Sequence, residues 1–102
     1  MSNGSATTQT VTIDVIQGII SVAPDIVHVS RGAGDDVEWT STYPFTVEFK
    51  PGSPFASATF PPAPGNAAAS GPVRPNAAKG RYKYKVKITG YRDLDPGVHV
   101  DP

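Results

Sequence analysis

The sequence predicts an all-β domain, an antiparallel β-sandwich of about seven short strands. Apolar residues alternate with polar residues along much of the chain, and this period of two places them on one face of a strand. The 102 residues include 10 glycines and 11 prolines, so turns must be frequent. Short strands about ten residues apart, separated by turn residues, are typical of antiparallel sandwiches.

The clearest strand spans 81–88, where aromatic and aliphatic residues alternate with basic ones. Its apolar face predicts a half-buried strand. In the predicted strand 37–39, Trp39 is expected to lie at the centre of the core, since it shares a face with Val37. The other predicted strands are 11–15, 19–22, 27–29, 37–39, 45–49 and 98–100.

A chain of this length is expected to form one domain. Residues 1–9 contain neither a basic start nor an apolar run, so we expect a disordered tail, followed by a single domain over 10–102. No apolar stretch reaches the roughly 20 residues of a spanning helix, so we expect no membrane insertion. The compartment stays open, because a periplasmic or secreted protein would fit if a signal peptide had been removed.

Residues 51–80 are predicted to form the longest loop, because they hold seven of the eleven prolines, which disfavour a long helix. Phe55 and Phe60 are expected to anchor the first half of this loop to the core. Long loops in compact domains are usually functional or mobile, although the alternative that we favour is a decorated connection. The candidate partner surface therefore combines this loop with the turn near residue 91: Phe55, Phe60, Arg74, Tyr91 and Arg92.

Formal charges cancel, with nine basic against nine acidic residues, so no nucleic-acid partner is expected. One local exception is the polar face of strand 81–88, which presents Arg81, Lys83, Lys85 and Lys87 in a row. This row could dock an acidic partner or a phosphate backbone. The alternative that we favour is an ordinary solvated face, on which carboxylates such as Glu38 and Glu48 pair with the lysines.

Four segments, in order, resemble the cupredoxins: 24–32, 35–39, 44–49 and 80–84. In that family a strand of alternating aliphatics leads through a Gly-Asp turn to Val-x-Trp, followed by Pro-His-Thr-Val-x-Phe and a late Tyr-x-Tyr-x-Cys strand. The resemblance covers about residues 10–102 and implies a Greek-key, cupredoxin-like β-sandwich. Ala33 and Gly34 depart from the pattern as an insertion in the Gly-Asp turn.

The residues that would bind copper in that family are replaced here. Phe45 stands at the position that resembles the first histidine, Val86 stands at the cysteine, and residues 87–96 contain neither histidine nor methionine. Blue-copper chemistry needs a thiolate and two imidazoles, so we expect no copper cofactor and no electron transfer. Residues 94–100 are similar to the ending of metal-free bacterial relatives, which implies that Phe45 and Val86 pack the pocket that copper occupies elsewhere.

His28 and His99 are the two imidazoles of the chain. Each lies between aliphatic residues that should point inward, so both side chains are expected at the surface. The resemblance implies that their strands run side by side. A two-histidine site for zinc or copper(II) is one hypothesis, and two solvated histidines without a ligand are the commoner alternative.

Catalysis is not expected, because the chain has no cysteine and neither histidine lies in a local context typical of a nucleophile or a held base. The carboxylate pairs 35–36 and 93–95 lie in turns, where aspartate commonly caps its own backbone. We therefore expect a non-enzymatic interaction or structural module that binds an unknown protein partner or a second copy of itself. The alternative is a metal-handling protein that uses His28 and His99.

Overall fold

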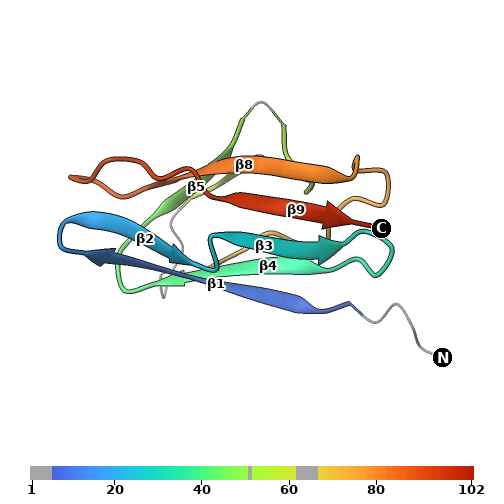
Figure 1. Cartoon of the computed structure of the whole chain (residues 1–102), viewed down its shortest axis with the longest axis horizontal. Helices are drawn as coiled ribbons and strands as arrows, with labels where there is room; N and C mark the ends of the chain where they lie inside the picture. Colours follow the sequence, from blue (N-terminus) through green and yellow to red (C-terminus); the bar gives the residue numbers. More distant parts are fainter. Residues whose placement is uncertain (1–5, 51, 62–66) are drawn as a thin grey trace.

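The computed structural model describes residues 6–50, 52–61 and 67–102, and over these residues it forms an all-β sandwich (Figure 1). The described part contains no helix that could cross a membrane. Its nine strands are β1 (Thr8–Ile16), β2 (Ile19–Ala23), β3 (Ile26–Ser30), β4 (Asp36–Ser41), β5 (Thr46–Phe49), β6 (Thr59–Phe60), β7 (Ala67–Ala69), β8 (Gly80–Lys87) and β9 (Gly97–Asp101).

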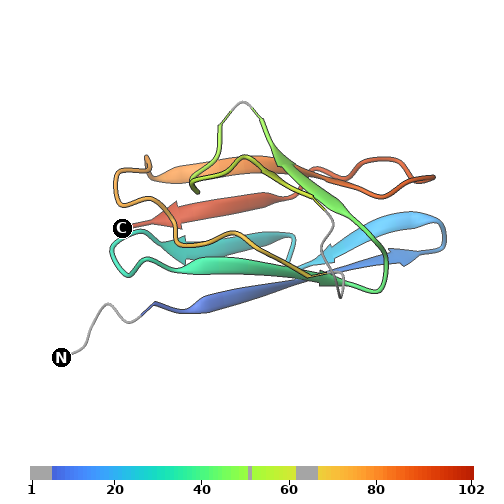
Figure 2. The ribbon, with the colours of Figure 1, turned by 180° about the vertical axis from the view of Figure 1, so that it is seen from behind.

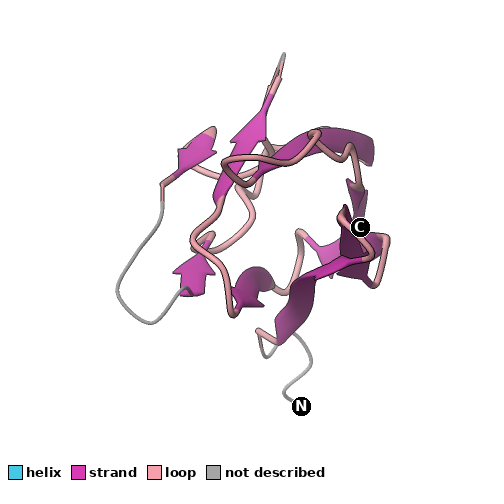
Figure 3. Ribbon diagram, turned by 90° about the vertical axis from the view of Figure 1, so that its left-hand side faces the viewer, coloured by secondary structure: helices cyan, strands magenta, loops and turns pink. Residues whose placement is uncertain are grey.

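The strands form two layers, which Figure 3 shows from one end. One sheet has the order β2-β1-β4-β7 and the other the order β3-β9-β8-β5-β6. Both sheets are mixed, because β1 pairs with β4 and β3 pairs with β9 in parallel. The all-β sandwich is therefore confirmed, while the expectation of purely antiparallel sheets is wrong. Alternation within one strand fixes which face is buried but contains no information on the direction of its neighbours.

β1 and β2 form a hairpin with a two-residue turn. Gln17 and Gly18 both have positive φ angles, 53° and 78°, as the tight turns that match the strand twist require. The turn fixes the register, which pairs Ile16 with Ile19 and continues to Thr12 opposite Ala23. β2 has no strand on its other side in the described residues and is an edge of its sheet.

Residues 51–80 do not form one long loop. They contain β6 and β7, and β7 pairs with β4 across Trp39 and Ala68. Figure 2 shows the following segment passing between β4 of one sheet and β8 of the other. Phe55 and Phe60 are buried, which agrees with their expected role as anchors. Residue 51 and residues 62–66, which belong to the same predicted loop, lie outside the described residues.

The N-terminal prediction is wrong at its boundary, because β1 begins at Thr8 instead of after residue 9. Parallel pairing with β4 starts at Thr8 opposite Asp36. The buried Asp35 carboxylate accepts the backbone N–H groups of Thr7 and Ser30, each at 2.9 Å. These bonds join the start of β1 to the end of β3. The first five residues of the predicted tail lie outside the described part of the chain.

Trp39 is the residue around which the core is built. Its indole projects from one sheet, is fully buried, and packs against aromatic rings of the other sheet and its loops. The ring centroids of Phe60 and Tyr84 lie 5.3 and 5.6 Å away, and those of Phe49 and Phe55 lie 6.2 and 6.4 Å away. These separations are typical of favourable aromatic pairs, so Trp39 links the two layers.

Two polar atoms inside this cluster have no hydrogen-bond partner in the described residues, Trp39 Nε1 and Tyr84 Oη. Burial raises the pKa of Tyr84 to about 12, because the phenolate would lose its hydration. The indole N–H of Trp39 is near enough to offset a small part of this rise in pKa, but the two groups do not reach hydrogen-bond geometry. Tyr84 therefore contributes a neutral, buried phenol to the core.

We predict that Trp39→Ala lowers the free energy of unfolding by about 3–5 kcal/mol, because it removes a large buried side chain and leaves a cavity. Urea unfolding followed by circular dichroism measures this change. Lys85→Ala, at an exposed position of β8, is the control and should shift the free energy by no more than about 0.5 kcal/mol. An unchanged stability of Trp39→Ala would show that the core is not built around this residue.

We also predict that Tyr84 makes stability fall at high pH. The raised pKa means that the native state keeps the phenolic proton between about pH 10 and pH 12, whereas the unfolded chain loses it. The stabilisation is therefore complete below pH 10 and declines by about 2–3 kcal/mol as the pH rises through this window. In Tyr84→Phe this decline should be absent when unfolding is measured from pH 9 to pH 12, and an identical decline in both proteins would contradict the assignment.

Candidate functional site

The structure brings His28 and His99 together on the outer face of one sheet. They are register partners on the parallel strands β3 and β9, and their ring centroids are 5.1 Å apart. The side-chain exposed fractions are 63% for His28 and 39% for His99, so both rings are open to solvent. The predicted surface position of the two imidazoles agrees with this geometry.

Asp101 forms a cluster with His28 and His99 that was not predicted from the sequence. Its two carboxylate oxygens contact both rings, at 3.3 Å from His28 Nδ1 and at 2.9 Å from His99 Nδ1. Asp101 follows His99 by two residues in β9, and residues two apart share a face of a strand. This spacing is the signal in the sequence that could have identified it.

The row of basic residues on β8 is exposed, as expected. Glu48 of the neighbouring strand β5 neutralises part of its charge. Glu48 Oε1 lies 3.4 Å from Lys87 Nζ and 3.5 Å from Lys50 Nζ. Desolvation raises the pKa of Glu48, but the two ammonium groups outweigh it and hold the pKa below its usual range. Glu38 cannot share this role, because it lies on β4 in the other sheet. Among the described residues, Glu48 is thus the acidic side chain that pairs with this row, through Lys87.

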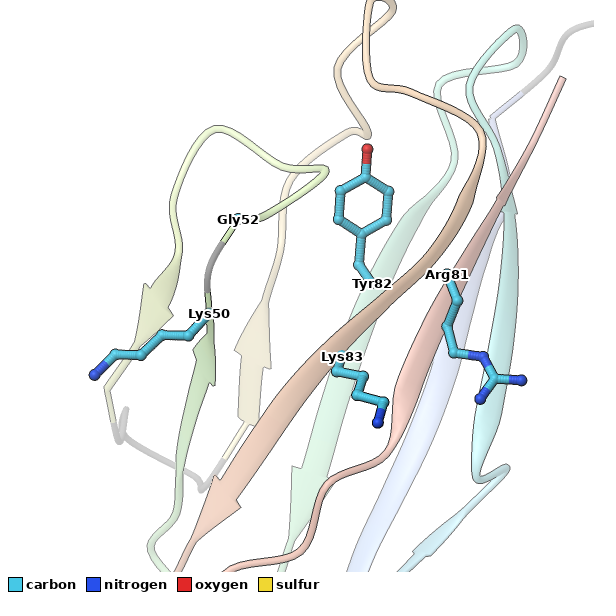
Figure 4. A pocket seen from close by; sticks show the side chains of 5 residues that line it. All are labelled: Lys50, Gly52, Arg81, Tyr82 and Lys83. Atoms are coloured by element: carbon cyan, nitrogen blue, oxygen red, sulfur yellow. The ribbon is translucent and has the colours of Figure 1, made fainter.

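A pocket of about 540 Å³ lies beside this row (Figure 4). Figure 4 shows the ammonium group of Lys50 and the guanidinium group of Arg81 pointing in opposite directions. The charged ends of Lys50 and Arg81 therefore do not converge on one point in this pocket. The residues that line the pocket are Lys50, Gly52, Arg81, Tyr82 and Lys83.

The candidate partner surface does not form one surface. Phe55 and Phe60 are 2% and 8% exposed, so they belong to the core instead of to a contact region. Arg74 is exposed, and it lines a pocket with the β3–β4 turn at one end of the sandwich and donates to the carbonyl oxygen of Ser53. The turn with the exposed Tyr91 and Arg92 lies at the opposite end, the left-hand end in Figure 1.

The β1–β2 turn, the β4–β5 turn and the β8–β9 loop all lie at that left-hand end (Figure 1). The exposed large hydrophobic residues of the described chain belong to these segments or border them. Ile16 and Ile19 are 55% and 68% exposed, the largest values among the described large hydrophobic residues. Tyr91, at 36%, packs edge-to-face on Tyr43 with centroids 6.4 Å apart. The exposure of these isoleucines was not predicted from the sequence. Alternation within the hairpin does not show which end of the domain other segments cover.

A groove of about 380 Å³ opens at the same end, between the edge strand β2 and the β8–β9 loop. Leu94 closes its far side, where its backbone pairs with Val86. The groove is lined by Ile16, Ile19, Ile20, Ser21, Val22, Asp25 and Leu94. Its lining is mostly aliphatic, so it fits apolar side chains better than a charged ligand.

Phe45 and Val86, the positions at which the cupredoxin resemblance expects copper ligands, are buried with exposures of 1% and 0%. Val86 pairs with Val47 of β5, and Phe45 directly precedes that strand. Neither side chain offers a donor atom for a metal. These two positions are part of the hydrophobic core.

The turn carboxylates have structural partners. Asp35 accepts two backbone N–H groups, as described above, and Asp36 accepts the hydroxyl of Thr8 at 2.7 Å. Asp93 and Asp95 are exposed in the β8–β9 loop. In the described part of the chain, the group of three potential metal-ligating side chains is His28, His99 and Asp101.

Comparison of the chain with models of known protein families and with curated proteins gives no match.

Proposed function

We propose that this chain is a non-enzymatic, copper-free cupredoxin-like module that binds a protein partner. The occupant that we propose for the end groove is an extended, apolar segment of the partner, which pairs with the free edge of β2. The exposure of Ile16 and Ile19 beside this unpaired edge is the observation on which the proposal rests.

The backbone of β2 is suited to accept another strand. Ile16 and Ile19 flank the two-residue turn, so they form a hydrogen-bonded pair, and alternation then directs the backbone groups of Ile20 and Val22 away from β1. These groups have no hydrogen-bond partner among the described residues. Unpaired edges of this kind are templates for strand addition.

The side chains around the edge supply the apolar contact. Alternate residues of an added strand would point toward the groove, whose far wall is Leu94. Burying the exposed isoleucines would contribute about 25 cal/mol for each Å² of apolar surface removed from water. Asp25 is the charged residue that lines the groove, so an apolar segment with a basic residue at one end matches it best.

Other features support the copper-free, cupredoxin-like part of the proposal. Phe45 and Val86 fill core positions, and β3 runs beside β9, as the family resemblance implies. A rigid sandwich with function at its ends is the usual arrangement for this architecture. We propose a Greek-key connection of the strands on the same resemblance.

We predict that a soluble peptide of alternating valine and threonine residues with one terminal lysine shifts the backbone amide NMR signals of β2. The shifts should saturate and centre on Ile20 and Val22, because the peptide hydrogen-bonds to their free edge. Ile19→Lys should weaken this binding at least ten-fold, since it places a charge on the most exposed of the described large hydrophobic residues. Thr12→Lys, an exposed site of the same hairpin outside the groove, is the matched control and should bind like the parent protein.

Sedimentation of the same samples distinguishes a partner segment from a second copy of this chain as the occupant of the groove. Without peptide, the protein should sediment as a monomer. A dimer that is lost in Ile19→Lys would mean that the occupant is a second copy of the chain. Equal peptide affinity in the Ile19→Lys and Thr12→Lys proteins, or the absence of saturable shifts in β2, would overturn the proposal.

A further inference from the structure

We propose that His28, His99 and Asp101 bind one divalent transition-metal ion, with zinc as the ion to test. The proposed ligands are one nitrogen of each imidazole and one carboxylate oxygen, and water completes the coordination. This site lies on β3 and β9 and shares no residue with the β2 groove. Zinc binding can therefore be tested independently of the proposed partner binding.

The pairing of the strands brings the three side chains together. His28 and His99 are opposite one another in the parallel ladder, with hydrophobic neighbours on either side that point into the core. Those buried valines fix both strands, so the imidazoles must project from the outer face. Asp101, two residues beyond His99, projects from the same face and is the register partner of Ser30.

The spacing of the donor atoms is close to that of a metal site. One potential ligand atom from each of the three residues lies within 4.8 Å of the other two. His28 Nδ1 lies 3.3 Å from Asp101 Oδ2, and His99 Nδ1 lies 2.9 Å from Oδ1 of the same carboxylate. Ligands about 2.0–2.1 Å from a tetrahedral zinc ion are separated by about 3.3–3.4 Å. Rotation of the exposed side chains would bring both nitrogens and one of these oxygens to that spacing.

The chemistry of the donors favours ions such as zinc. Imidazole and carboxylate together suit divalent zinc and copper, whereas calcium and magnesium prefer oxygen ligands alone. Each neutral imidazole has one proton, which can reside on Nε2 and leave Nδ1 free to bind the ion. The carboxylate offsets part of the charge of the ion, and the exposure of all three side chains gives an open entry path.

Arg81 places a positive charge on the strand next to the proposed site. It is the register partner of His99 on β8, so its side chain lies on the same outer face, where its stem passes over Gly97. A fixed positive charge near the site lowers the affinity for a cation. Removal of the Arg81 charge should therefore strengthen binding of the ion.

Zinc titration of the full chain at pH 7.5, by calorimetry and by the imidazole NMR signals, tests the site. We expect one ion per chain and shifts of both imidazoles, which are the chain's two histidines. His99→Gln should weaken binding at least ten-fold, and Asp101→Asn about ten-fold. Arg81→Gln should strengthen it two- to five-fold.

Asp93→Asn, which removes an exposed carboxylate from the β8–β9 loop, is the control and should leave zinc affinity within two-fold of the parent protein. Circular dichroism establishes that each variant is folded. No saturable zinc binding, or an affinity unchanged by both His99→Gln and Asp101→Asn, would overturn the proposal and leave the carboxylate as a hydrogen-bond acceptor for two solvated imidazoles.

Discussion

Trp39 packs against the opposite sheet and joins the two layers of the sandwich. The indole occupies the interior next to Phe49, Phe60 and Tyr84, so the distance between the layers is set by aromatic rings. Because Trp39 holds the two sheets together, the loops and turns at the two ends of the sandwich need not contribute to the core. The apolar groove and the imidazole cluster are both outside this core, on edges and faces that it holds in place.

Much of the fold could be predicted from the sequence, because a period of two assigns each residue to a face. The alternation around Val86 and Trp39 identified core residues that are fully buried. The parallel pairing of β1 with β4 could not be predicted in this way, since it depends on contacts far apart in the chain. The short strands β6 and β7 were hidden by a composition rich in proline and alanine, which gives little signal for a strand.

The sites were predictable to different degrees. The surface position of His28 could be predicted from its aliphatic neighbours. Its proximity to His99 could be predicted only from the order of strands that the cupredoxin resemblance implies. Asp101 shares that face by a spacing of two, yet its contact with both rings depends on side-chain directions that alternation does not specify. Ile19 belongs to an apolar run that resembles any buried strand, and it is exposed because none of the described residues covers it at that end.

The proposed partner binding requires that the edge of β2 is free to accept a strand. Amide hydrogen exchange of the protein alone measures this freedom. We expect fast exchange at Ile20 and Val22, whose N–H groups face away from β1, and slow exchange at Ser21, which pairs with Asp14. Slow exchange at all three amides would mean that this edge is already covered and cannot accept a partner strand.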